Sequence, residues 1–362
     1  MNIKAHKFSK SADADFAQTL RKKVNSYFAE KGISKYANTE MVIKSIAMFA
    51  FYFVPYFLII FNASDSSWMN LLFWSIMAIG MSGIGFSVMH DANHGAYSKN
   101  KIINKIMANT INLIGANDSV WRMQHNILHH TYTNIDGLDE DIDSDPYLRF
   151  NPHQELKWFH KYQFLYAPVL YCIMTLAWTS FTDFTQAARY KRKGLIRSKE
   201  ALKKELKAIS LWKVFYFAYI MVIPMIFSNQ PWYLILLGFV IMQVVTGLFI
   251  SLVFQAAHVV PAMEFPMPNK EGNMENNWMV HQLRTTANFA TKSRVFGWFA
   301  GGLNFQVEHH LFPNICHTHY RKIAKIVEDT AKEYGHPYFN YNHTVVSAFV
   351  DHFRMLYRLG KA

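Results

Sequence analysis

The stretch WMNLLFWSIMAIGMSGIGFSVM, Trp68–Met89, contains no charged residue and runs directly into HDANH, His90–His94. A helix rises ~1.5 Å per residue, so about 20 apolar residues cross the ~30 Å hydrocarbon core of a bilayer. The stretch therefore predicts a membrane-spanning helix that ends at a pair of histidines.

Three further apolar stretches complete the predicted membrane part. Short polar breaks at 62–67 and 228–231 have the residue types of tight turns and arrange the stretches as two helical hairpins. Lys44 and Lys213 lie near the ends of two of these stretches, where a lysine can reach the membrane surface. The four expected spans cover residues 41–61, 68–89, 211–227 and 232–254.

Composition agrees with this class of protein. Hydrophobic residues make up 51% of the 362 residues and charged residues 17%, with 37 basic against 25 acidic side chains. So apolar a chain is not disordered, and two cysteines, Cys172 and Cys316, provide no disulfide framework. The first forty residues are polar, and no secretory signal peptide is expected.

Residues 164–181 form a fifth apolar stretch, followed at 189–207 by nine basic and two acidic residues. As a span it would place the histidine clusters on opposite sides of the membrane and the basic segment outside, against the positive-inside tendency. We therefore expect an interfacial or partly embedded helix here. The predicted fold is an all-α integral membrane protein with four transmembrane helices in two hairpins and a cytoplasmic helical cap that holds a di-metal site.

The expected organisation has three parts. Residues 1–40 form a cytoplasmic N-terminal segment, residues 41–320 the membrane domain, and residues 321–362 cytoplasmic C-terminal helices, where apolar residues repeat at helical spacing. No strand is expected.

Three histidine clusters carry the chemistry: HDANH at 90–94, HNILHH at 125–130 and QVEHH at 306–310. Residues four apart share one face of a helix, so His90 with His94, or His125 with His129, can point two imidazoles at one metal, while His130 reaches a neighbouring one. Imidazole suits iron, copper, zinc and nickel. The clusters hold seven histidines, which exceeds what one ion can bind and implies two metals: His90, His94, His125, His129, His130, His309 and His310.

The remaining histidines are weaker candidates. His258, just past the fourth span, is the best additional ligand, and His281, His317 and His319 have less support. The acidic loop 136–145 is expected to be a solvated loop. The surface histidines are expected to be His6, His153, His160, His336, His343 and His352.

The string GGLNFQVEHHLFP, 301–313, together with the other two clusters, resembles the integral-membrane fatty acid desaturases over about residues 41–320. The likeness is closest to the front-end group, in which glutamine replaces the first histidine of the third cluster; Gln282, Thr286 and Asn288 fit this group too. The resemblance implies that the eight histidines above, including His258, bind two non-haem irons. It makes Gln306 a metal-binding or water-holding residue, and Asp91 is expected to orient a ligand imidazole.

The resemblance also implies a reaction. A front-end desaturase inserts a double bond between an existing one and the carboxyl end of an acyl-CoA or acyl-lipid chain, with O₂ and two electrons. No His-Pro-Gly-Gly haem motif of a fused cytochrome b5 domain occurs, so a separate donor of ferredoxin or cytochrome b5 type is expected. The basic stretch at 189–207 can attract that donor, coenzyme A phosphates or anionic membrane lipid. The active site is expected on the cytoplasmic side, with no nucleic-acid partner.

Two other readings stay open. A related di-iron hydroxylase or sphingolipid desaturase shares the histidine pattern. A non-enzymatic membrane metal-binding protein or transporter is more remote, because a transport pathway needs ionisable residues inside the spans, and 68–89 and 232–254 contain none.

Overall fold

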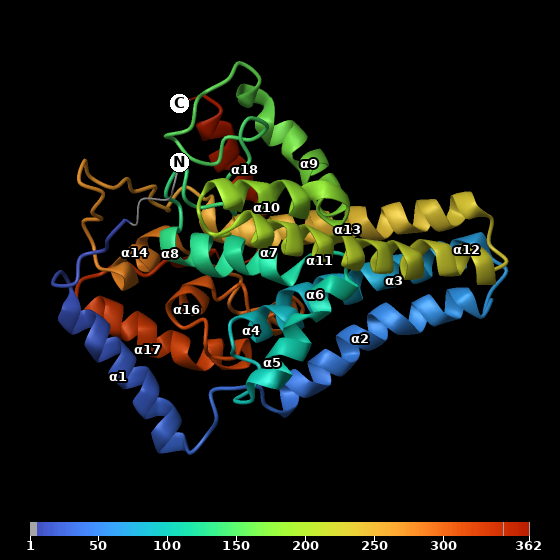
Figure 1. Ribbon diagram of the computed structural model, residues 1–362. Coiled ribbons are helices and arrows are strands. Elements are labelled where there is room, and N and C mark those ends of the chain that lie inside the picture. Colours follow the sequence, from blue (N-terminus) through green and yellow to red (C-terminus); the bar gives the residue numbers. More distant parts are fainter. Residues whose placement is uncertain (1–5, 343, 362) are drawn as a thin grey trace.

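The computed structural model describes residues 6–342 and 344–361, and its regular structure is almost entirely helical (Figure 1). Within that part, the only strands are β1 (Asn288–Phe289) and β2 (Asn340–Asn342), which form one short parallel pair. No sequence pattern indicated this pair, because each strand is too short for side-chain alternation to be visible.

In the described part of the chain, five helical segments are long and apolar enough to cross a membrane. They are α2 (Thr39–Ile60), the continuous segments Ser67–Asn93, His160–Arg192 and Lys199–Phe227, and α13 (Trp232–His258). The segment Ser67–Asn93 contains α3 (Ser67–Gly83), the π-helix η1 (Ile84–Val88) and α4 (Met89–Asn93). The segment His160–Arg192 contains η3 (His160–Tyr162), α9 (Gln163–Ala177), η4 (Trp178–Thr182) and α10 (Asp183–Arg192). The segment Lys199–Phe227 contains α11 (Lys199–Phe217), η5 (Ala218–Val222) and α12 (Ile223–Phe227). Three of the four predicted spans fall within one of these segments, and the fourth, 41–61, extends one residue past the end of α2.

Side-chain caps set where these helices begin. The side chain of Asn38 accepts a hydrogen bond from Met41 N at the start of α2, and Ser198 does the same for Ala201 N at the start of α11. Such caps satisfy backbone N–H groups that have no partner within the helix. The helix containing the predicted span 211–227 therefore begins earlier, at Lys199.

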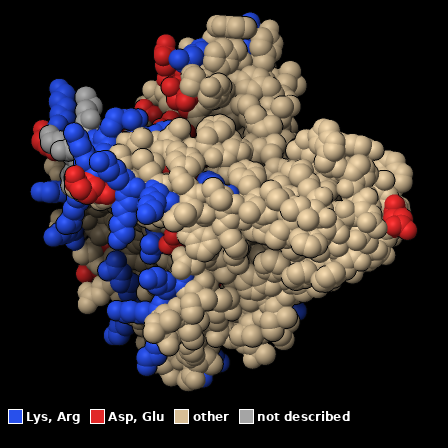
Figure 2. All heavy atoms as spheres, turned by 45° about the vertical axis from the view of Figure 1, so that its right-hand side comes forward, with Lys and Arg blue, Asp and Glu red and all other residues tan. Residues whose placement is uncertain are grey.

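Helices α2, α3, α12 and α13 extend as one arm, to the right in Figure 1, and the two turns at its tip touch each other. Asn62 Nδ2 donates to Phe227 O at 3.2 Å, and Asn229 N donates to Asn62 Oδ1 at 2.5 Å. Figure 2 shows that the arm surface is almost free of charged side chains, whereas Lys and Arg gather at the opposite end. This distribution is that of an apolar arm, suited by length and composition to a membrane, on a polar end that we call the cap.

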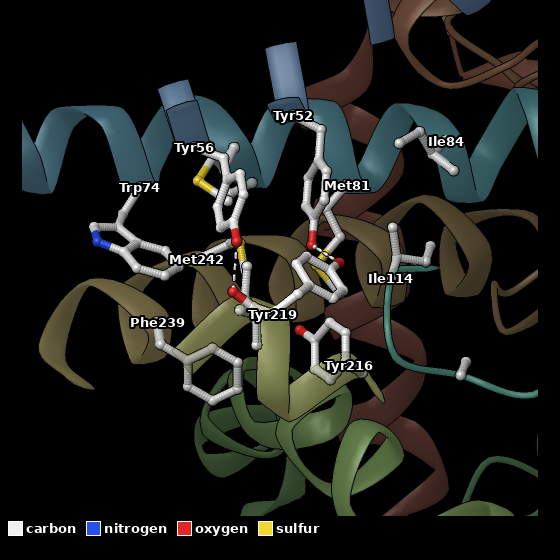
Figure 3. Packing of buried hydrophobic residues seen from close by; sticks show 14 of the residues in the cluster. Tyr52, Tyr56, Trp74, Met81, Ile84, Ile114, Tyr216, Tyr219, Phe239 and Met242 are labelled. Atoms are coloured by element: carbon white, nitrogen blue, oxygen red, sulfur yellow. Dashed lines mark hydrogen bonds between the residues drawn. The ribbon is translucent and has the colours of Figure 1, made fainter. Parts of the chain in front are cut away.

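Buried tyrosines join the two hairpins inside the arm (Figure 3). Tyr52 and Tyr56 reach from α2 to η5, where the Tyr52 and Tyr219 hydroxyls lie 2.8 Å apart and Tyr56 donates to Tyr219 O at 2.6 Å. On α13, Gln243 Nε2 donates to the Tyr216 hydroxyl at 2.7 Å. Because hydrocarbon offers no hydrogen bonds, these polar groups satisfy each other and fix the helices together.

The cap contains the remaining helices. They are α1 (Ala14–Lys31), α5 (Lys101–Ala108), α6 (Thr110–Leu113), α7 (Asp118–Arg122), η2 (Met123–His129), α8 (His130–Tyr132), α14 (Trp278–Thr285), α15 (Arg294–Phe299), α16 (Gln306–Leu311), η6 (His317–His319), α17 (Tyr320–Glu333) and α18 (Val345–Leu359). N-terminal α1 packs against α17 through Phe16, Leu20, Ile323 and Val327. Segments that are about 300 residues apart in the sequence thus share one hydrophobic cluster within the cap.

Candidate metal centre

The eight predicted histidine ligands meet where the apolar helices enter the cap. Seven of them are buried and His94 is partly exposed. His90 lies on α4 and His94 at its C-terminal cap, His125 and His129 on η2, His130 on α8, His258 at the end of α13, and His309 and His310 on α16. Residues far apart in the sequence are therefore brought to one place.

One group contains His90, His94, His125 and His309, whose ligand nitrogens all lie within 4.8 Å of one another. His90 Nε2 and His125 Nε2 are 3.2 Å apart, and the rings of His94 and His309 are 5.0 Å apart between centroids. The π-helix η1 ends at Val88, two residues before His90, and such π-segments are frequent at functional sites.

The second group contains His129, His258 and His310. His129 Nε2 lies 3.2 Å from His310 Nε2, and the His258 ring is 4.7 Å from that of His129. His130 stands between the groups: its Nε2 lies 2.9 Å from His309 Nε2 of the first group, and its ring lies 4.4 Å from that of His310 of the second, measured between centroids. The two groups, with His130 between them, have the size and the donors expected for two adjacent metal ions.

The second cluster differs from the expected helical arrangement. We expected His125 and His129 to face one metal, but His125 Nε2 faces His90 and His130, whereas His129 Nε2 faces His310. The segment Met123–His129 is a π-helix, not an α-helix. Its wider turn brings His130, five residues after His125, beside the His125 ring.

The outer nitrogens of these imidazoles are held by other groups. His125 Nδ1 lies 2.7 Å from Asp141 Oδ2, and His129 Nδ1 lies 2.9 Å from Asp139 Oδ1. His310 Nδ1 lies 2.8 Å from the Gln282 side-chain oxygen. An Nδ1–H that donates outward leaves the Nε2 lone pair free to bind a metal at the centre.

Burial and mutual proximity keep most of these rings neutral. Burial, followed by the neighbouring imidazoles, lowers the pKa of His94, His125, His130, His309 and His310 well below the ordinary value. Burial alone would lower the pKa of His129 too, but Asp139 and Asp141 outweigh it and raise that pKa. Neutral imidazoles with converging lone pairs are the form that binds a metal.

Sequence reasoning missed the role of the acidic loop. Asp139 and Asp141, expected in a solvated loop, point inward to histidines, while Glu140 between them is buried and pairs with Arg189 and Lys193 of the basic segment. Asp139 and Asp141 thus lie on the histidine side of the loop, whereas Asp143, like Glu140, pairs with Arg189. The acidic loop alone did not show which of its carboxylates would face the histidines.

Asp91 has a different main partner from the one expected. Its Oδ2 accepts from His317 N at 3.1 Å and lies 2.8 Å from His317 Nδ1, whereas Oδ1 is 4.0 Å from His90 Nδ1. His317 Nε2 in turn contacts Lys44 Nζ at 2.6 Å. Asp91 thus fixes His317 directly, and its action on His90 stays a prediction.

Gln306 faces the second group. Its Nε2 lies 2.9 Å from His258 Nε2 and 3.5 Å from His310 Nε2, and its buried Oε1 has no hydrogen-bond partner among the described residues. The start of α16, which carries Gln306, is fixed by Asn288, whose Oδ1 accepts from Val307 N at 2.9 Å.

Two histidines predicted at the surface are buried. His352 Nε2 lies 2.7 Å from the Tyr171 hydroxyl and its Nδ1 2.9 Å from Val259 O, and His160 Nε2 lies 2.8 Å from Pro146 O. The partners of His352 are distant in sequence, and those of His160 lie in the adjoining loop, where no regular pattern marked the contact. His281 and His319 are also buried, outside both groups; His6 and His336 are partly exposed, His153 is exposed, and His343 lies outside the described residues.

The comparison with known proteins agrees with this geometry. The family model described as fatty acid desaturase matches residues 66–342, which contain all eight histidines. The chain belongs to the fatty acid desaturase family. Enzymes of this family are oxidoreductases that act in lipid metabolism, so the desaturase is a membrane enzyme and not a metal transporter.

Named relatives cover nearly the whole desaturase chain. It is 35% identical to the sn-1 linoleoyl-lipid 6-desaturase of Synechocystis, over 96% of each chain. It is 34% identical to the sn-1 linoleoyl-lipid 6-desaturase of Arthrospira platensis, over 88% of this chain and 86% of the relative. It is also 34% identical to the acyl-lipid (8-3)-desaturase of Physcomitrium patens, over 98% of this chain and 73% of the relative.

Proposed function

We propose that this desaturase inserts a double bond into a lipid-linked acyl chain on the carboxyl side of an existing one, with O₂ and two electrons from a separate donor. The observation that carries the proposal is the set of eight histidines whose inner nitrogens converge at the end of the apolar arm. The acyl-lipid names of the relatives favour this substrate over a sphingolipid, and favour desaturation over hydroxylation.

The residues fit two non-haem irons. The donors in the two groups are all imidazoles, and several Nε2 atoms lie about 3 Å apart. Where a neutral ring keeps its proton on Nδ1, its Nε2 presents only a lone pair, and a bound cation would stabilise such lone pairs facing each other. When bound, two irons supply O₂ activation for removal of hydrogen from an unactivated methylene. One group would hold each ion, with His130 beside both and Gln306 near the second.

The protein itself supplies orientation and a dry site. Trp121 stacks on His125 with 4.5 Å between ring centroids, and Phe254 lies 5.0 Å from His129 and 4.9 Å from His258. These aromatic side chains exclude water from the inner face of the histidines. Asp139, Asp141 and Gln282 hold the outer nitrogens, which fixes the rings before substrate arrives.

Contacts of α9 support four spans rather than five. Thr175 Oγ1 donates to Gln243 O at 2.7 Å, near the middle of α13, and Lys213 Nζ donates to Trp178 O at 2.6 Å where α9 ends. From there α10 returns beside α11 to Arg189, which pairs with Glu140 next to the histidines. A segment that enters halfway and returns leaves both ends on the histidine side, which we propose is cytoplasmic.

A cysteine at position 199 tests this topology. In right-side-out cells, a membrane-impermeant maleimide should leave Lys199→Cys unlabelled until the membrane is opened, because the basic end of α11 would face the cytoplasm. Asp65→Cys, at the tip of the arm, is the matched control and should react from outside. Outside labelling at position 199 would require α9 to cross the membrane and would reject the four-span topology.

Expression in a host supplied with defined polyunsaturated fatty acids tests the activity. Mass spectrometry of derivatives that locate double bonds should show a new double bond between the existing one and the carboxyl end, in lipid-bound chains. A His310→Ala strain is the control for host activity. A hydroxylated product, or a new bond on the methyl side, would reject the proposed reaction.

A further inference from the structure

A cavity of about 440 Å³ lies on the outer side of the first histidine cluster. Ala92, Asn93 and Gly95, which flank the ligand candidate His94, form part of its wall. The opposite wall comes from α5 and α7. The residues lining the cavity are Ala92, Asn93, Gly95, Lys101, Asn104, Lys105, Ala108, Asp118 and Arg122.

The cavity is positively charged. Lys101 and Lys105 lie one turn apart on α5, and among the described residues neither ammonium group has an ion pair or a side-chain hydrogen bond. Arg122 faces them from α7 and pairs with Asp118, the one acid in the lining, at 3.2 Å. Three cations against one carboxylate leave a net attraction for an anion.

The position of α5 indicates which kind of anion the cavity binds. Ile102, Ile103 and Ile106 are 69%, 41% and 61% exposed, so this eight-residue helix carries an uncovered apolar face beside its lysines. A short helix with these two faces lies in the membrane interface, with its apolar face in the acyl region. Its lysines then lie at the level of lipid headgroup phosphates.

We propose that the cavity binds the phosphate group of the acyl carrier, and so determines how far the carboxyl end of the chain lies from the metal centre. This inference rests on the proposed function, because a double bond near the carboxyl end requires the headgroup to be held only a few carbons from the histidines. Lys101 and Lys105 supply the charge, and Arg122 has further donors beside its contact with Asp118.

Binding to the purified iron-containing enzyme tests the site without turnover. Short-chain phosphatidylglycerol and linoleoyl-CoA each carry phosphate, and a galactosyl diacylglycerol with the same chains does not. Lys101→Ala/Lys105→Ala should weaken binding of a phosphate-bearing ligand about tenfold or more, because charge-assisted hydrogen bonds are lost. Binding of the galactolipid should not change, and Lys101→Arg/Lys105→Arg should keep most of the affinity.

The matched control is Lys22→Ala/Lys31→Ala, which removes two exposed charges from α1, away from the cavity and from the basic segment 189–207. Weakening confined to phosphatidylglycerol assigns the phosphate to a phospholipid, and weakening confined to linoleoyl-CoA assigns it to coenzyme A. The proposed site is rejected if the Lys101/Lys105 alanine variant binds both phosphatidylglycerol and linoleoyl-CoA with wild-type affinity. It is also rejected if the control variant loses as much affinity as the Lys101/Lys105 variant. If the Lys101/Lys105 alanine variant binds the phosphate-bearing ligand more weakly but the wild-type enzyme forms no double bond, the proposed function is rejected and the phosphate site is still supported.

Discussion

Replacing His129 by alanine is expected to abolish product and to lower the bound iron. Its Nε2 lies 3.2 Å from His310 Nε2 in a fully buried group, where no other side chain can take its place. Even partners of metal ligands change affinity or activity by about 10- to 100-fold, so the loss of a ligand should exceed ~100-fold. His310→Ala should behave in the same way. The measurements are iron per purified chain and product yield.

The substitution Asp139→Asn tests the carboxylate that holds His129, while it leaves the histidine ligand itself in place. The carboxylate lies against His129 Nδ1 and also accepts from Asn134 N at 2.8 Å and Asp141 N at 3.0 Å. The amide keeps the size but not the charge, so we expect about a 10- to 100-fold loss in metal affinity or activity, less than for His129→Ala. His153→Ala, at an exposed histidine, should change neither. Full activity in His129→Ala would remove that residue from the ligand set.

The features that could be predicted from the sequence are those that depend on a local pattern. Long uncharged stretches identified the apolar helices, and the paired histidines identified which residues would meet, including His258 without a neighbouring partner. The ends of helices were less predictable, because α11 continues through charged residues from Lys199 under its Ser198 cap.

What the sequence could not provide depends on contacts between distant segments. Asp139 was predicted to lie in a solvated loop, because no sequence pattern near it indicates that the loop packs against η2 and contacts His129. His352 looked like a surface residue of an amphipathic helix, yet α18 packs on α9 and buries it against Tyr171. The π-helical turn at Met123–His129 has no sequence signature, and it decides which imidazole lies beside His125.

Gln306→Ala is expected to keep most of the iron and lose most of the turnover. The side chain lies 2.9 Å from His258 Nε2 and 3.5 Å from His310 Nε2, at the edge of the second group. The neighbouring imidazoles are sufficient to retain an ion, whereas an amide is a much weaker ligand for iron. Turning the amide by 180° places its unpaired oxygen toward the same two rings, where it can hold a water or contact a cation.

Gln306→His supplies a stronger donor, four residues before His310 on the same helix face, and should retain part of the activity. Iron content and product yield are compared in Gln306→Ala, Gln306→His and His310→Ala. Loss of iron and turnover together is the expected result only for His310→Ala, because that change removes an imidazole from the group. For Gln306→Ala we expect the two quantities to separate, with yield at least about tenfold lower at nearly unchanged iron. Wild-type yield in Gln306→Ala would show that the residue marks the family without acting at the metal centre.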